Sequence, residues 1–227
     1  NPDGSRRSAL DQFNRAADVS STGSQMPVAL GLAMASRIFA ARPNEPSFAQ
    51  LSAEGREIAW VSIGDASTAE GNFWSAQAQA VVQDAPLVTS VMDNRMGISV
   101  PVDRQTPHAN ISCGVAGFAP LVENAPGLKI IGPVKGWHWL DCYLAYQAAA
   151  RWTRESRHPS LVHSYVTQPF NHSSSGDNRH KSPAHLQWER ERDILDHMER
   201  WLLQHGIASE SELAAIKDEE TSYVDAE

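Results

Sequence analysis

The chain has 227 residues, of which 41% are hydrophobic and 20% charged, with a formal net charge of -8. This length and composition predict a globular protein with a sizeable core, arranged as one α/β domain or at most two small ones. The acidic balance, with no cluster of Lys and Arg to offset it, argues against binding to nucleic acid or to an anionic membrane.

Targeting and redox signals favour a cytoplasmic protein. No apolar run approaches the roughly 18 residues of a transmembrane helix, and the opening "NPDGSRRSALDQ" does not resemble a signal peptide. Cys113 and Cys142 match no metal-binding spacing and are expected to be reduced thiols. The first residue is not Met and no clear first element follows it, so we expect a piece of a longer polypeptide.

Strand and helix patterns alternate along the chain. The polar residues 1–20 predict a loop or a frayed helix, and Ser24 is a plausible N-cap for a helix of small side chains that follows it. Four short apolar runs predict strands, over 57–63, 86–92, 128–134 and 160–167, and the first two are expected to be buried. Helices are expected over 25–41, 68–84 and 136–158, and a loop over 97–117. Such alternation predicts a doubly wound, mainly parallel sheet with helices on both faces.

The C-terminal part reads differently. The polar stretch 168–183 is long enough for a functional or disordered loop. Helices are expected over 184–206 and 209–227, with Ser209 and Glu212 forming a capping box for the second. The charge run "ERERDILDHMER" predicts a solvated helix face. We therefore divide the chain into an α/β domain over 1–182 and a helical extension over 183–227.

Polar residues follow two of the predicted strands directly. Gly64-Asp65 ends one strand and Asp93-Asn94 ends the next, where ligands bind in parallel α/β sheets. Carboxylate and carboxamide oxygens suit Mg²⁺, and the carbonyl of Met96 could add a ligand. The main-chain N–H groups of a helix opening after residues 66–68 could receive a diphosphate. The alternative is that Asp65 only caps this helix and that Asp93-Asn94 makes an Asx turn.

Several segments resemble one known family. "GDA", an interval of 26 residues (92 minus 66) and "DN" are similar to the fingerprint of thiamin diphosphate enzymes. "GDASTAEGNFWSA", "MGISVPVDRQT" and "TQPFNHSSSGD" resemble the α-type part of the decarboxylating first component of 2-oxo acid dehydrogenase complexes. The resemblance spans roughly residues 15–225, and it includes a subgroup in which α- and β-type halves can be fused.

This resemblance implies a thiamin diphosphate and Mg²⁺ site. Gly64 would shape the turn, and His172 would be the active-site histidine of a mobile loop. Three residues would bind Mg²⁺: Asp65 and Asn94 by side chain and Met96 by its carbonyl. Other positions would lie near parts of the cofactor or a monovalent cation: Ala66 and Ser67 at the diphosphate, Ser20 and Thr22 at the aminopyrimidine, and Ser24 and Gln25 at the cation.

Four positions depart from the family pattern. Ala66 replaces the last Gly of the fingerprint, and Asp93 replaces the first Asn of the pair. Met92 stands where the family often has an Arg that contacts the diphosphate, a charged contact worth about 1.5–3 kcal/mol. Met96 replaces a Tyr, which matters little if its carbonyl is the ligand. Arg95 is the neighbouring side chain that could replace the missing Arg.

The resemblance also implies partners. A β-type half, separate or fused, would supply the glutamate that activates the cofactor, and a lipoyl-bearing acyltransferase would accept the acyl group. This chain would then be half of an active site within an obligate oligomer, and branched-chain 2-oxo acids are the favoured substrates. Ser173–Ser175 match a segment that is phosphorylated in some relatives, but a plain polar loop is favoured here.

Two alternatives remain open. One is another thiamin diphosphate enzyme, such as a transketolase or an acetoin-cleaving relative, which would not depend on a lipoyl acceptor. The other is a truncated subunit without catalytic activity that keeps the fold and an assembly interface. Met92 and the abrupt start of the sequence favour this second alternative.

Overall fold

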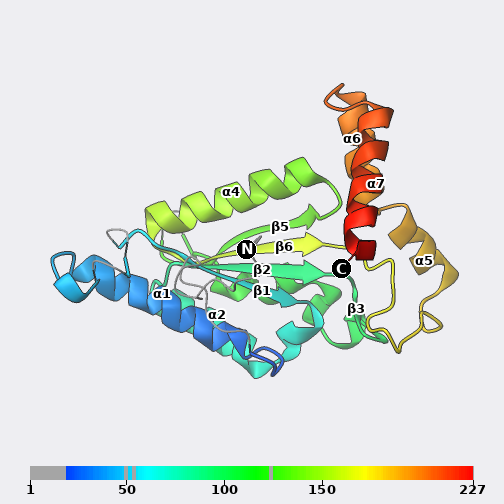
Figure 1. Cartoon of the computed structure of the whole chain (residues 1–227). Helices are drawn as coiled ribbons and strands as arrows, with labels where there is room; N and C mark the ends of the chain where they lie inside the picture. Colours follow the sequence, from blue (N-terminus) through cyan, green and yellow to red (C-terminus); the bar gives the residue numbers. More distant parts are fainter. Residues whose placement is uncertain (1–18, 49–50, 53–54, 123–124, 227) are drawn as a thin grey trace.

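The computed structural model describes residues 19–48, 51–52, 55–122 and 125–226. Its centre is a four-stranded sheet in the order β1-β2-β6-β5, in which every neighbouring pair is parallel (Figure 1). Each strand lies within two residues of the predicted run: β1 Ala59–Gly64, β2 Leu87–Asp93, β5 Lys129–Lys135 and β6 Ser160–Tyr165. The predicted parallel sheet is thus confirmed, while the polar segment expected over 1–20 lies almost wholly outside the described residues.

Helices cover both faces of the sheet (Figure 1). Helices α1 (Gln25–Ala41) and α2 (Gly71–Val82) pack on one face, and α4 (Trp139–Ser156) packs on the other. The predicted bounds of α1 are confirmed, although the Ser24 side chain makes no capping hydrogen bond. Because α1 presents small buried residues such as Ala29 and Ala33, its backbone can lie close to the sheet and to α2.

The buried apolar side chains form two clusters, one on each side of the sheet. The larger lies among α1, α2 and the strands and includes Phe73, Ile63 and Leu161. The smaller lies between α4 and the sheet and includes Ala149 and Val162. Both clusters hold the four strands in one rigid layer, which fixes where their carboxyl ends lie.

The segment predicted as a loop over 97–117 contains short ordered elements. It forms a hairpin of β3 (Met96–Gly97) with β4 (Val100–Pro101), then a short helix α3 (Ile111–Gly114). Asn110 caps α3, because its side chain accepts a hydrogen bond from the main-chain N of Cys113 at 3.2 Å. The prediction was wrong here because such short elements leave no periodic pattern in the sequence.

Two predicted helices are each divided in the structure. Residues 68–84 give the 3-10 helix η3 (Ala66–Ala69) and then α2, with Glu70 extended between them at φ -71° and ψ 139°. Residues 184–206 give α5 (Pro183–Arg190) and α6 (Ile194–Gln204). The second break occurs because Asp193 caps α6, accepting from the main-chain N of Leu195 at 2.9 Å.

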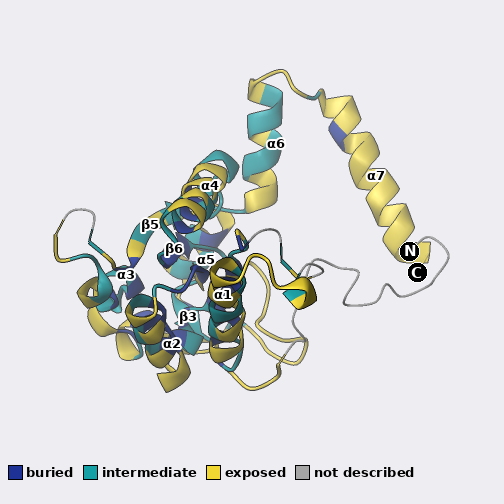
Figure 2. Cartoon of the chain, turned by 90° about the vertical axis from the view of Figure 1, so that its left-hand side faces the viewer, coloured by how far each residue is buried: buried dark blue, intermediate teal, exposed yellow. Residues whose placement is uncertain are grey.

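The last helix, α7 (Glu210–Ala226), stands with α6 away from the sheet (Figures 1 and 2). Leu213 is the one residue that α7 buries within the described chain, and most of the helix is exposed (Figure 2). The predicted capping box is confirmed, since Ser209 N donates to Glu212 at 2.8 Å and Glu212 N donates back to Ser209 at 3.3 Å. None of the helices in the described ranges is both long and apolar enough to cross a membrane.

Candidate functional site

The carboxyl ends of β1, β2 and β6 meet at one edge of the sheet (Figure 1). Gly64 pairs with Met92 in the β1–β2 register, and Asp65 N donates to Met92 O at 3.1 Å. Val166 N donates to Asp93 O at 2.8 Å, which joins β6 to the same edge. The predicted convergence of the two strand ends is therefore present.

Asp65 is a buried carboxylate without a full set of partners. Asp65 is 3% exposed, and its Oδ2 has no hydrogen-bond partner among the described residues. Burial, followed by the negative charge of Asp93, raises the pKa of Asp65 to about 7, although main-chain N–H groups oppose the shift. The side chain makes no capping hydrogen bond to η3, so the alternative of a simple helix cap is wrong. An unpartnered buried carboxylate of this kind fits a cation.

Asp93 is equally buried but fully partnered. Its Oδ2 lies 3.0 Å from His163 Nε2 and 3.3 Å from Arg95 Nη1, and its Oδ1 accepts from Arg95 N at 2.7 Å. Burial alone would raise the pKa of Asp93, but these hydrogen bonds and the charge of Arg95 together lower it. His163 in turn bonds through Nδ1 to Ser112 Oγ at 2.9 Å. The Asp at this position therefore has its own buried partners.

Sequence reasoning missed His163. It is 0% exposed and lies within the strand "SLVHSYVT", where it was counted only as part of an apolar run. A histidine between apolar residues of a buried strand must find polar partners, so its presence was a usable signal.

Asn94 is held at both ends of its carboxamide. Its Oδ1 accepts from Met96 N at 2.9 Å, and its Nδ2 donates to Gln168 Oε1 at 2.8 Å. The Asx-turn alternative is thus confirmed for Asn94, and Asp93 makes the same turn with Arg95. The turn leaves Asn94 able to bind a cation, because its Oδ1 keeps a second lone pair.

Ala66 begins η3, where a helical backbone needs no Gly. The first N–H groups of a helix lack partners within it, so Ala66 and Ser67 can offer donors to an anion. Gly97 lies against this turn, since a Cβ built on it would lie 2.8 Å from Ala66 Cβ and 2.5 Å from Gln105 Oε1. Within the described part of the chain, Gln105 Nε2 is buried without a hydrogen-bond partner, a polar atom near the site that sequence reasoning missed.

Arg95, the candidate to replace the missing diphosphate-binding Arg, is already bonded to other protein groups. Its Nη1 also donates to Ala109 O at 3.0 Å, and its guanidinium lies 5.2 Å from the centre of the Tyr165 ring. These contacts hold Arg95 beside Asp93, while Met92 is exposed.

The available donors suit a hard cation better than a thiolate metal. In the described part of the chain, no group of three or more His, Cys, Asp or Glu could hold a metal by itself. The oxygens at the strand ends are instead one carboxylate, one carboxamide and main-chain carbonyls, a set that fits Mg²⁺ when phosphate and water complete its shell. Both cysteines are free, as expected.

The predicted residues before α1 lie at the start of that helix. Ser20 and Thr22 are exposed, and Gly23 lies against Glu70 at the start of α2. The Gln25 side chain donates to Ser62 O of β1 at 3.2 Å, which ties the start of α1 to the sheet. Of Ser24 and Gln25, the latter therefore already has a protein partner.

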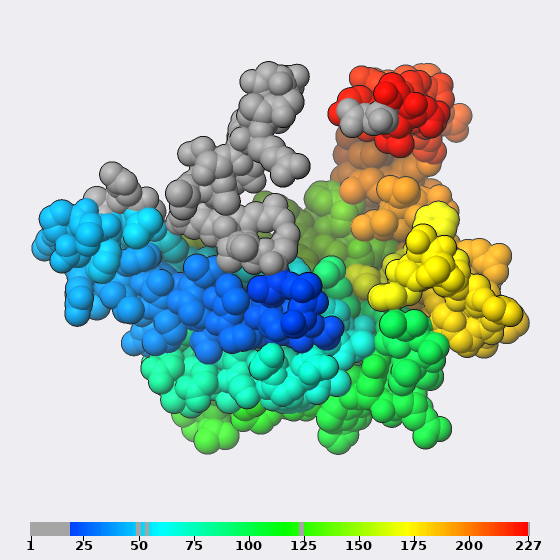
Figure 3. All heavy atoms as spheres, turned by 60° about the horizontal axis from the view of Figure 1, so that its bottom comes forward, coloured from blue at the N-terminus to red at the C-terminus, as the bar shows by residue number. Residues whose placement is uncertain are grey.

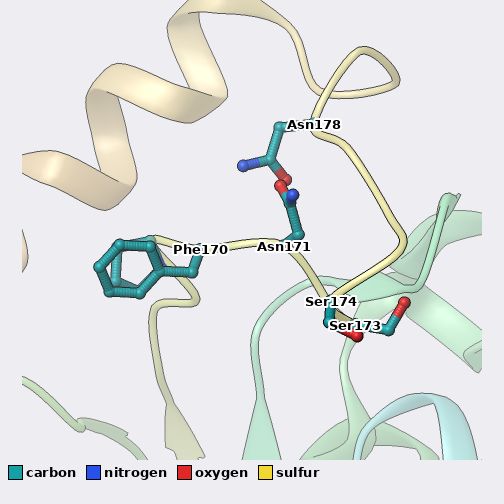
Figure 4. Close-up of a pocket in the computed structure, with 6 residues that line it drawn as sticks. Phe170, Asn171, Ser173, Ser174 and Asn178 are labelled. Atoms are coloured by element: carbon teal, nitrogen blue, oxygen red, sulfur yellow. The ribbon is translucent and has the colours of Figure 1, made fainter.

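The loop 168–181 lies beside the segment that holds β3 and β4 (Figures 1 and 3), and His172 is one of its exposed residues. The loop folds around a cavity of about 300 Å³ whose lining includes Asn171, Ser173 and Asn178 but not His172. Figure 4 shows the side chains of Asn171 and Asn178 facing each other, with Phe170 to one side. The structure thus places His172 on a surface loop, where no hydrogen bond or ion pair to another described residue holds it.

The charge run after this loop is not wholly solvated. Glu189, its first residue, is 1% exposed and forms an ion pair with Lys181 at 2.8 Å. The prediction of a solvated face is wrong for Glu189, because the periodic pattern does not show that the loop returns over α5.

Comparison with known proteins places the chain. A family model described as "Dehydrogenase E1 component" matches residues 4–227. The chain belongs to this family. It is 26% identical over 219 residues to "2-oxoisovalerate dehydrogenase subunit alpha" of Bacillus subtilis (strain 168), covering 92% of the chain and 64% of the relative.

Two further relatives agree. "Pyruvate dehydrogenase E1 component subunit alpha" of Acholeplasma laidlawii is 27% identical over 202 residues, 87% of this chain and 51% of that protein. "3-methyl-2-oxobutanoate dehydrogenase subunit alpha" of Mycobacterium tuberculosis (strain CDC 1551 / Oshkosh) is 28% identical over 149 residues, which are 65% of this chain and 38% of that protein. The aligned parts of these three E1 relatives thus amount to between 38% and 64% of their lengths. The resemblance to the α-type component is confirmed.

Proposed function

We propose that this E1 chain is the α-type half of a thiamin diphosphate-dependent 2-oxo acid dehydrogenase. The observation that carries the proposal is Asp65, a buried carboxylate at the carboxyl edge of the sheet whose Oδ2 has no hydrogen-bond partner in the described ranges. Membership of the family supports the same reading. Under this proposal the site residues act together at the edge where β1 and β2 end.

Asp65 and Asn94 would hold Mg²⁺ through side-chain oxygens, and Met96 would add its carbonyl. Gly64 would let the chain turn there, and Ala66 and Ser67 would offer N–H groups to the diphosphate. Ser20 and Thr22 would lie toward the aminopyrimidine, and Ser24 and Gln25 toward a monovalent cation. When bound, thiamin diphosphate supplies the nucleophilic carbon and the electron sink that decarboxylation of a 2-oxo acid requires.

His172 would stabilise charge that develops during the reaction. It is an exposed residue of the loop 168–181, which begins shortly after β6 ends at Tyr165 and so can reach the strand ends. Closing of this loop over the site would also exclude water from the reacting atoms.

The remaining parts of the proposal concern partners and substrate. A β-type half would carry the activating glutamate, and a lipoyl-bearing acyltransferase would receive the acyl group, in a cytoplasmic assembly. Residues 1–182 would form the cofactor domain and 183–227 a helical extension. Branched-chain substrates are favoured because two of the three relatives are named for 2-oxoisovalerate or 3-methyl-2-oxobutanoate.

The test is reconstitution of the chain with a β-type partner and a lipoyl domain. We expect CO₂ release from a branched-chain 2-oxo acid that depends on Mg²⁺ and thiamin diphosphate, with acylation of the lipoyl group. Product formation without a lipoyl acceptor would instead favour a transketolase-like or acetoin-cleaving enzyme. Absence of cofactor binding even with the partner would favour a non-catalytic assembly subunit.

A further inference from the structure

Gln168 joins two parts of the molecule that are far apart in sequence. Its side-chain Oε1 accepts from Asn94 Nδ2 at 2.8 Å, so it contacts the end of β2. Its main-chain oxygen accepts from Lys181 Nζ at 3.0 Å, so it also contacts the far end of the loop. One residue therefore connects the candidate cation site with the closed base of the loop that carries His172.

Lys181 gives this connection a rigid support. Its Nζ lies 2.8 Å and 2.9 Å from the two carboxylate oxygens of Glu189 on α5, and His185 Nε2 lies 3.3 Å from Glu189 Oε1. The side chains of Lys181 and Glu189 are 3% and 1% exposed. Burying such a pair is costly and requires tight geometry, so the pair fixes one position for the end of the loop.

The contact also sets which way the Asn94 carboxamide faces. Nδ2 bonds to Gln168 and Oδ1 bonds to Met96 N, so rotation of the amide by 180° would break both hydrogen bonds. The free lone pair of Oδ1 is thereby kept in one direction. A ligand oxygen held in this way needs little further ordering when a cation binds.

We propose that Gln168 is a positioning residue that orients Asn94 for the cation and couples the cation site to the loop 168–181. The coupling rests on the proposed function, because it needs a cation at Asn94. It is reciprocal: a cation that fixes Asn94 stabilises the base of the loop, and a loop detached from Gln168 weakens cation binding by the same factor.

The experiment compares Gln168→Met, which keeps the length of the side chain but loses the acceptor, with Gln168→Glu, which retains one. Gln147→Met is the matched control, because Gln147 is an exposed glutamine on α4 that bonds only to Tyr143 among the described contacts. Each full-length protein is titrated with Mg²⁺ by calorimetry. Hydrogen exchange of the loop 168–181 is measured with EDTA and with saturating Mg²⁺.

We expect Mg²⁺ to slow exchange of the loop in the unsubstituted chain and in Gln147→Met. Gln168→Met should bind Mg²⁺ about threefold to tenfold more weakly, the effect of one lost hydrogen bond, and its loop should not respond to the metal. Gln168→Glu should restore the response. A loop in Gln168→Met that responds to Mg²⁺ like that of the unsubstituted chain would overturn the inference.

The measurements in EDTA separate this inference from the proposed function. If the unsubstituted chain binds no Mg²⁺, this chain alone does not form the cation site, and the titration with thiamin diphosphate and a β-type partner decides the proposed function. The contact of Gln168 with Asn94 is still tested then, because Gln168→Met should exchange its loop amides faster in EDTA than the control does. Equal exchange in the two variants would count against the positioning role, whatever the result with metal.

Discussion

Asp65 and Asp93 show how two residues of one type differ through their surroundings alone. Asp65 directly follows β1, Asp93 is the last residue of the adjacent strand β2, and both are buried. Asp93 has His163 and Arg95 as partners, which lower its pKa, whereas burial and the neighbouring charge of Asp93 raise the pKa of Asp65 to about 7. Of the two carboxyl groups, Asp65 is therefore the one that is costly to ionise. A bound cation would stabilise its negative charge.

The first prediction concerns the pH dependence of the cation-free chain. The folded pKa of Asp65, about 7, lies above the ordinary aspartate pKa of 3.8, so the folded state binds more protons than the unfolded state between these pH values. Stability should consequently fall as pH rises through that window. Asp65→Asn removes this loss, and its Tm in EDTA at pH 8 should exceed that of the unsubstituted chain by roughly 2–4 °C.

Melting curves at pH 5 and pH 8, read by circular dichroism, check this expectation. The advantage of Asp65→Asn should shrink at pH 5, where the carboxyl is protonated. An equal difference at both pH values would show that Asp65 does not titrate between them.

Some individual residues of the site could be predicted from the sequence. Asp65, Asp93 and Asn94 could be placed together because they directly follow strand patterns, and strand ends in a parallel sheet share an edge. The contributions of Gln168, His163 and Gln105 could not be predicted, because they depend on contacts between residues that are distant in sequence. Glu189 was misjudged for the same reason.

At the scale of elements, the loop 168–181 is held by its ends. Lys181 and Glu189 fix its return onto α5, and Thr167 Oγ1 donates to Arg192 O at 3.2 Å near its start. The guanidinium of Arg192 lies 5.3 Å from the Trp137 ring and 5.0 Å from the Trp188 ring, which packs α5 against the start of α4. The loop between these anchors is exposed and can move without disturbing the sheet.

The second prediction tests the anchor. Lys181→Met leaves the Glu189 carboxylate buried without its cation and should lower the free energy of unfolding by about 3–5 kcal/mol. Adding Glu189→Leu should recover most of this loss, because no unpaired charge then remains. Urea denaturation measures both, with Lys217→Met as control, since its exposed pair with Glu199 contributes about 0–1 kcal/mol. A double variant as unstable as the single one would refute the explanation.

The third prediction concerns His172. In the reconstituted enzyme, His172→Ala should lower turnover by about 10²–10³ while cofactor affinity stays nearly unchanged, because the imidazole would act on developing charge. The control is His180→Ala, another exposed histidine of the same loop. Steady-state kinetics and a cofactor titration check both. Turnover equal to that of the control would remove His172 from the mechanism.

For the whole molecule, the parallel sheet and its covering helices are the part that sequence patterns predict well. Strand bounds agree within two residues because each strand is a compact apolar run between turn or loop signals, and β2 and β6 at the centre of the sheet are almost wholly buried. The breaks at Glu70 and Asp193 were missed because apolar periodicity continues across them. The placement of α6 and α7 away from the sheet could not be foreseen from amphipathic pattern alone (Figure 2).

The fourth prediction follows from that placement. Because α7 buries little beyond Leu213, a chain ending at residue 208 should unfold at a Tm within about 2 °C of the full chain. Differential scanning calorimetry of both chains under identical conditions measures the difference. A clearly lower Tm would mean that α7 stabilises the sheet domain.

The central claim is that the edge where β1 and β2 end is a Mg²⁺ and diphosphate site built around Asp65. The most direct measurement is calorimetric titration of the chain with thiamin diphosphate in Mg²⁺, alongside Asp65→Ala and an EDTA control. The account predicts binding heat that requires Mg²⁺ and that Asp65→Ala abolishes. Binding that persists in Asp65→Ala or in EDTA would contradict it, and so would absence of heat even when a β-type partner is present.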